Sequence, residues 1–139
     1  MTNLQVVKSF LEQVFRGEMT QALALVASDA VFIPSRPEFH DLVPLYGTFR
    51  GQDGAAKVFQ NFAALLKPGV FQVHAEFEHA DHAVMYGHLQ HQAQASGNTF
   101  SSDWALICKI KQGLIQYYHF YEDTAALEHA LAIRLYSAQ

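Results

Sequence analysis

Three side chains that could move a proton, Asp103, Glu122 and His88, fall on three neighbouring strand-like segments. If the connecting turns centre on residues 96–97 and 112–113, Asp103 lies opposite Glu122 on one side, opposite Gln90 on the other, and diagonal to His88. Directly opposed Cβ atoms are about 4.5–5.5 Å apart, so the two carboxyl groups could divide acid and base roles. We predict that Asp103, Glu122 and His88 form the catalytic polar group of an otherwise apolar cavity.

Asp103 is predicted to project onto an apolar surface, because its same-face strand neighbours are Ala105 and Ile107. Desolvation on that surface would raise the pKa of the carboxyl, and a neutral carboxylic acid can donate a proton or a hydrogen bond. The alternative is that backbone amides near a sheet edge satisfy Asp103. A one-residue change in either turn would send these side chains to opposite faces, which would leave Glu122 solvated and His88 without a role.

Apolar residues at helical spacing predict four helices that surround these strands. The first begins at a capping box of Thr2 and Gln5 and stops at Gly17. The second runs from Thr20 to about residues 28–29, and the third runs from residue 53 to a stop at residues 68–69. A last, short helix begins at residues 123–124 and continues through residue 135. Residues 34–45 hold three of the four prolines and are predicted to form a loop that is long enough to act as a lid.

Strand signals make up the rest of the chain, with short segments at 30–33 and 46–50 and four longer ones at 71–77, 83–94, 99–110 and 114–122. The element order favours a single domain over 1–139 of the α+β class, with helices on one face of a curved antiparallel sheet. The segment 104–108 is apolar on both faces, and so is 117–121. Because a sheet of this kind needs cover on both faces, we predict a homodimer through the outer sheet face.

Several local strings give the chain a family resemblance. It resembles the SnoaL-like branch of the nuclear transport factor 2-like superfamily, which includes steroid isomerases, limonene epoxide hydrolases and polyketide cyclases. The matching strings are RGE (16–18), SDAVF (28–32), GTFRG (47–51), KQGLI (111–115) and YEDT (121–124). The resemblance implies a cone-shaped, cystatin-like sheet wrapped by N-terminal helices, with a pocket on its concave side and often a dimer across its convex side.

The resemblance also predicts what several positions would do. The phenol of the isomerases would fall at Phe10, their general-base carboxylate at Pro34, and the last-strand acid of the hydrolases and cyclases at Phe120. None of these three side chains can transfer a proton. Asp103 matches the second oxyanion-hole donor of the isomerases, so it is the family position at which an acid is retained.

Aromatic and apolar residues from separate elements are predicted to line the cone, and the aromatic lid residues Phe39 and Tyr46, with His40, to cover its mouth. One hypothesis is a proton-transfer isomerase, hydratase or cyclase that uses Asp103 with Glu122 or His88. The other is a non-catalytic domain that binds a small hydrophobic molecule. The ligand-binding residues expected in both cases are Phe10, Val14, Phe32, Pro34, Tyr46, Phe59, Phe62, Gln90, Tyr118 and Phe120.

Composition excludes several other classes of function. The chain has 139 residues and a formal charge of −4, which gives no basic footprint for nucleic acid. Its apolar runs are too short to span a membrane, and the lone Cys108 cannot form an intrachain disulfide. The eight histidines include no metal-ligand pattern, and no phosphate-binding glycine loop occurs. We therefore expect a cytoplasmic protein without a metal or other cofactor.

Overall fold

The protein is described by a computed structural model that covers residues 1–135 in detail, and its α+β architecture confirms the predicted fold class. The helices are α1 (Asn3–Phe15), α2 (Met19–Leu23), α3 (Gly51–Leu65) and α4 (Thr124–Ala130). The strands are β1 (Val26–Ile33), β2 (Phe49–Arg50), β3 (Leu66–His79), β4 (His82–Ala93), β5 (Thr99–Lys111) and β6 (Leu114–Glu122). None of the helices within residues 1–135 is long and apolar enough to cross a membrane.

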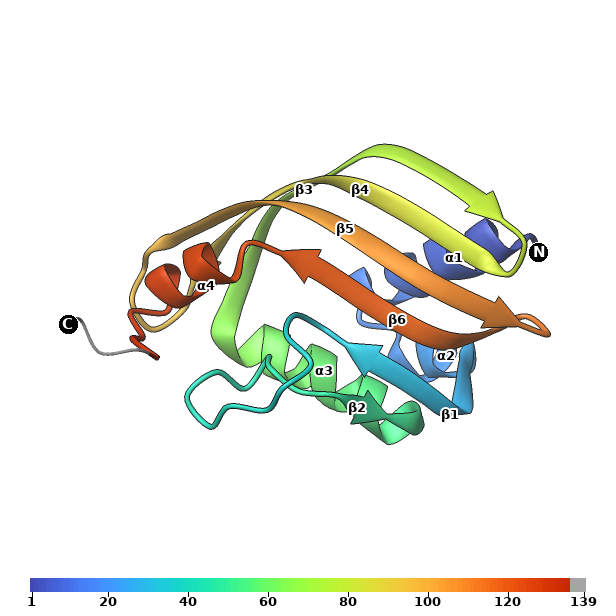
Figure 1. Cartoon of the computed structure of the whole chain (residues 1–139), viewed down its shortest axis with the longest axis horizontal. Helices are drawn as coiled ribbons and strands as arrows, with labels where there is room; N and C mark the ends of the chain where they lie inside the picture. The colour runs from blue at the N-terminus through green and yellow to red at the C-terminus, as the bar shows by residue number, and fades with distance from the viewer. Residues whose placement is uncertain (136–139) are drawn as a thin grey trace.

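One curved sheet of six strands, in the order β2-β1-β6-β5-β4-β3, bends over α1, α2 and α3 (Figure 1). Strands β3 to β6 form an antiparallel meander, while β1 pairs with β6 in parallel. The concave face of the sheet carries most of the core, because residues on β4 and β5 alternate between buried and exposed positions. The helices cover this face and leave the convex face open.

Helix ends follow the local signals in some places and depart from them in others. The capping box of Thr2 and Gln5 is present, and Asp123 caps α4 by accepting a hydrogen bond from the Ala126 amide at 3.1 Å. The predicted second helix is too long, because β1 takes residues from Val26 onward into the sheet. The third helix ends earlier than predicted, since Leu66 already has extended backbone and Pro68 lies within β3.

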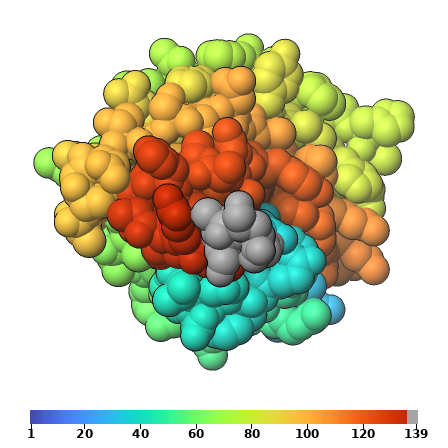
Figure 2. Space-filling model, turned by 60° about the vertical axis from the view of Figure 1, so that its left-hand side comes forward, coloured from blue at the N-terminus to red at the C-terminus, as the bar shows by residue number. Residues whose placement is uncertain are grey.

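The predicted lid is a packed loop. In residues 34–48, Val43 and Tyr46 are almost fully buried, and the Tyr46 hydroxyl donates a hydrogen bond to the Glu128 carboxylate of α4. Figure 2 shows this loop (cyan) beside α4 (red) on the face turned toward the viewer. Phe39, in contrast, is 77% exposed. The expectation that Phe39 and Tyr46 together cover the cavity mouth is therefore wrong.

A β-bulge in β6 decides which acid faces the core. Lys111 pairs with Leu114 and Ile110 pairs with Ile115, as a turn at residues 112–113 requires. The next pair is Lys109 with Tyr117, so Gln116 is an extra residue in β6. Beyond it the register is shifted by one residue, and Glu122 lies opposite Trp104. The predicted pairing of Glu122 with Asp103 is therefore wrong, although the predicted turn is correct.

Candidate functional site

The concave face of the sheet and helices α1, α2 and α3 enclose a cavity of about 720 Å³. This is within the range of about 300–1,000 Å³ that is usual for small-molecule sites. Its walls are mostly apolar and rich in aromatic rings. Of the ten residues predicted to bind a ligand, six line it: Val14, Pro34, Phe59, Phe62, Tyr118 and Phe120.

The other four predicted ligand-binding residues lie elsewhere. Phe10 and Phe32 have no exposed surface and form the core behind the cavity wall, where both rings pack against Tyr118. Tyr46 is held by α4, as described above. Gln90 is an exposed residue of β4 on the convex face, and it pairs with Ser101 instead of Asp103.

Glu122 is the acidic side chain that lines the cavity, and it does so at the end of β6. It retains some accessible surface because it borders the open cavity, yet the surrounding protein largely desolvates its carboxyl group. Burial raises the pKa of Glu122 from 4.5 to about 8, the neighbouring charge of Asp123 adds to the rise, and the Ser35 hydroxyl offsets part of it. At neutral pH the carboxyl therefore carries a proton and can donate it.

Two further polar groups near Glu122 lack ordinary partners within residues 1–135. The Ser35 hydroxyl is buried just after β1 and forms no hydrogen bond of normal geometry, although it lies close enough to the carboxyl to affect its pKa. Trp104, directly opposite Glu122 in the ladder, buries its indole Nε1 without an acceptor. Buried polar groups are normally satisfied, so both are exceptions, but neither residue lines the cavity.

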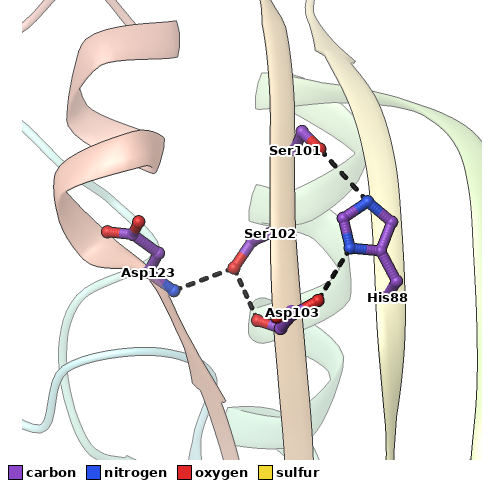
Figure 3. A network of polar contacts seen from close by, with 5 residues as sticks. All are labelled: His88, Ser101, Ser102, Asp103 and Asp123. Atoms are coloured by element: carbon purple, nitrogen blue, oxygen red, sulfur yellow. Dashed lines mark hydrogen bonds and ion pairs between the residues drawn. The ribbon is translucent and has the colours of Figure 1, made fainter.

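Asp103 and His88 lie on the other side of the sheet from the cavity. The Asp103 carboxylate is 92% exposed and accepts a hydrogen bond from His88 Nδ1 at 2.9 Å, and His88 Nε2 lies 3.1 Å from the Ser101 hydroxyl (Figure 3). His88 is directly opposite Asp103 instead of diagonal to it, because the β4–β5 turn centres on residues 95–96, one residue before the predicted place. The expectation that Asp103 faces an apolar hollow is wrong.

The Ser101–His88–Asp103 chain of contacts has the order of a hydrolase triad. It lies on an open sheet surface, and none of its members lines the cavity. Exposed ion pairs of this kind contribute about 0–1 kcal/mol to stability. We therefore assign no chemistry to this cluster.

His91 is a cavity residue that sequence reasoning missed. It is 4% exposed and faces the concave side of β4, opposite in direction to His88. Its Nδ1 accepts a hydrogen bond from the Gly69 amide at 3.0 Å, and its ring meets Phe62 edge to face with centroids 5.4 Å apart. Burial lowers the pKa of His91, with partial compensation by the Gln90 backbone, so the ring is neutral at pH 7. The alternation of apolar residues along 83–93 could have indicated its direction.

No group of three or more His, Cys, Asp or Glu side chains within residues 1–135 is placed to hold a metal ion. The lone thiol, Cys108, is buried on the concave side of β5, where burial raises its pKa. The chemistry that this cavity can support is therefore that of its carboxyl, hydroxyl and imidazole groups against an apolar wall.

Comparison with solved structures shows close agreement in fold. A nuclear transport factor 2-like protein from Burkholderia xenovorans is 25% identical, with 93% of this chain and 95% of that chain covered and a TM-score of 0.83. A candidate isomerase from Rhodopseudomonas palustris is 17% identical, with 95% and 99% covered and a TM-score of 0.76. A candidate polyketide cyclase from Pseudomonas putida is 15% identical, with 94% and 98% covered and a TM-score of 0.74.

No curated protein matches the chain. The family model of the SnoaL-like domain matches residues 7–118, which include most of α1, the loop at residues 34–48 and all of the sheet except the end of β6. The chain therefore belongs to the SnoaL-like family, within the nuclear transport factor 2-like fold.

Proposed function

We propose that this protein binds a small, largely apolar organic molecule in the concave cavity, and that Glu122 donates a proton or a hydrogen bond to an oxygen atom of that molecule. The observation that carries the proposal is the position of one desolvated carboxyl in a cavity walled by aromatic rings. Apolar walls with a few convergent polar groups are typical of small-molecule sites.

The reaction class that fits is a proton transfer of the isomerase, hydratase or cyclase kind. A general acid works best when its pKa is near the working pH, and Glu122 meets this condition. In the simplest step, the protonated carboxyl gives its proton to a carbonyl oxygen, and the carboxylate so formed takes a proton from the adjacent carbon. The C–H bond breaks, an O–H bond forms, and the product is an enol.

Matched ligands can test the binding step. We expect acetylnaphthalene to bind about three- to tenfold more tightly than ethylnaphthalene, which has a similar shape but no oxygen, because one hydrogen bond is gained. Glu122→Gln keeps a donor and should retain this preference, whereas Glu122→Leu should lose it. Since the donor ionises near pH 8, the preference of the wild-type protein should fall above that pH, and that of Glu122→Gln should not. Equal binding of the two compounds at pH 7 would contradict the proposal.

Deuterium exchange tests the chemical step. In heavy water, the wild-type protein should accelerate exchange at the acetyl methyl group of acetylnaphthalene, because enolisation removes one of its protons. Glu122→Gln can bind the ketone but cannot take up the proton, so it should abolish the acceleration. General acid–base catalysis usually contributes 10²–10⁴-fold, so a smaller loss than about tenfold would exclude this role for Glu122.

Binding without turnover is the second candidate function. It is favoured by the other ionisable side chains that line the cavity within residues 1–135, which are Lys67, His91 and Tyr118. Lys67 and His91 lie on β3 and β4 and not beside Glu122, and burial raises the pKa of Tyr118, so its phenol keeps its proton and is no base. An enzyme with separate acid and base groups would need a second one at the same end. Tight binding of acetylnaphthalene with no accelerated exchange would support this second function over the first.

We further propose a homodimer through the convex face of the sheet. Phe77, Tyr86 and Tyr121 on this face are each about half exposed, and Ala105 and Ile107 lie between them. Contiguous apolar surface of this kind usually marks an interface. Sedimentation of the wild-type protein should show a dimer at micromolar concentration, and Ile107→Glu should convert it to a monomer. A wild-type monomer at that concentration would refute the proposal.

We also expect the protein to work in the cytoplasm, where its single, buried Cys108 stays reduced. Fractionation of cells that produce a tagged chain would test this expectation, and recovery mainly outside the cytoplasm would contradict it.

A further inference from the structure

His91 gives the cavity a second hydrogen-bond donor. Because its Nδ1 accepts the Gly69 amide proton, the neutral ring carries its own proton on Nε2. This Nε2–H group has no hydrogen bond of ordinary geometry to any part of residues 1–135. The imidazole ring also cannot flip easily, because the hydrogen bond from Gly69 and the contact with Phe62 hold its orientation. The donor is therefore fixed in place before any ligand arrives.

The two donors stand at opposite ends of the cavity. His91 pairs with Phe100 and Glu122 pairs with Trp104, so they are two strands apart and four residues apart along β5. At the usual spacings within and between strands, their Cα atoms are about 16 Å apart in a flat sheet, and closer across the concave face of a curved one. No single oxygen atom can reach both groups, but the ends of one elongated molecule can.

The wall between these ends favours a flat molecule. Phe71 stacks on Trp104 with centroids 4.5 Å apart and an interplanar angle of 13°, and Trp104 stacks on Phe120 at 5.4 Å and 17°. Phe71 and Phe120 line the cavity, and Trp104 stacks on one face of each ring. A flat conjugated ligand can stack on the face of Phe71 or Phe120 that Trp104 leaves uncovered, and offset stacking there adds to the free energy gained by burial alone.

We propose that the cavity selects elongated, flat, apolar molecules that carry a hydrogen-bond-accepting oxygen at each end, one bound by Glu122 and the other by His91 Nε2. This inference rests on the proposed function and adds the class of ligand and a specificity-determining residue. It also explains why a histidine is tolerated in an apolar wall, where an aromatic ring of similar size would pack without a desolvation cost.

A graded series of probes tests the inference: biphenyl, its para-acetyl ketone, and the diketone with an acetyl group at each end. In the wild-type protein, each added ketone should tighten binding about three- to tenfold. In His91→Phe, which keeps the contact with Phe62, biphenyl and the monoketone should bind within about twofold of wild type, and the diketone should lose its advantage over the monoketone. Thermal melting of His91→Phe checks that the variant is folded.

The outcomes separate the two proposals. If biphenyl and the monoketone bind but the diketone binds no more tightly, or keeps its advantage in His91→Phe, the role of His91 is refuted and the proposed function stands. If none of the three compounds binds, both proposals fail.

A measurement on the wild-type protein does not depend on the folding of the variant. In NMR spectra of histidine-labelled protein, the Nε2–H signal of His91 should shift on addition of the diketone and not of biphenyl, and an unchanged signal would refute the contact.

Discussion

Replacement of Glu122 by Gln should stabilise the protein at neutral pH and remove most of the loss of stability between pH 5 and pH 8. The reason is the rise of the pKa from 4.5 to about 8 on folding. Below pH 4.5 the carboxyl is protonated in both the folded and the unfolded chain, so it causes no penalty. As the pH rises toward 8, the unfolded chain releases this proton and the folded chain retains it, so stability falls. Above pH 8 the penalty is constant.

The size of the effect follows from the same two pKa values. One pH unit between them corresponds to about 1.4 kcal/mol, so the penalty is at most about 3 kcal/mol at pH 7 and about 5 kcal/mol above pH 8. Water in the cavity screens the carboxylate and reduces both figures. Glutamine has nearly the same shape and stays neutral, and its amide can hydrogen-bond to the Ser35 hydroxyl.

Denaturant unfolding of both proteins at several pH values between 4.5 and 9 measures this difference. Other groups also titrate in this range, notably His91 and His119, whose pKa values are both lowered by burial. They are common to the two proteins, so the difference between the two curves isolates Glu122. The curves should meet near pH 4.5 and diverge toward pH 8, with Glu122→Gln the more stable. Parallel curves would show that the carboxyl is solvated, and the proposed function would lose its main support.

Two further predictions concern the convex face and the sheet. Asp103→Asn should change the free energy of unfolding by less than about 1 kcal/mol and leave acetylnaphthalene binding unchanged. The reason is that this carboxylate is 92% exposed and lies outside the cavity. A tenfold loss of affinity for acetylnaphthalene would contradict this location. Gly87→Ala should destabilise the protein by about 3 kcal/mol or more in denaturant unfolding, because the new Cβ would lie 1.7 Å from the Gln72 carbonyl oxygen. Gly113→Ala is the matched control, because Gly113 has φ at +75° but a Cβ there would meet no neighbouring atom. It should lower the free energy of unfolding by only about 1 kcal/mol. Equal losses of stability in the two variants would contradict the steric argument.

Much of the fold could be predicted because its signals are local. The capping box at Thr2, the alternation along 83–93 and the turn at 112–113 each depend on a few adjacent residues, and each is present in the structure. The chemical site was harder to predict because it depends on side-chain direction in a sheet. Nothing in the residues around Gln116 distinguishes a bulged strand from a regular one, and the position of this one residue reverses the directions of all the side chains that follow it in β6.

The extra residue in β6 also limits what can be learned by comparing related sequences. Two relatives can share the same hairpin, the same number of residues and the same acids, yet place opposite acids inside if only one of them has the bulge. A catalytic residue transferred by counting from the hairpin would then be assigned to the wrong side of the sheet. In this family, the face of the sheet toward which each side chain of the last strand points has to be established before any acid is assigned a role.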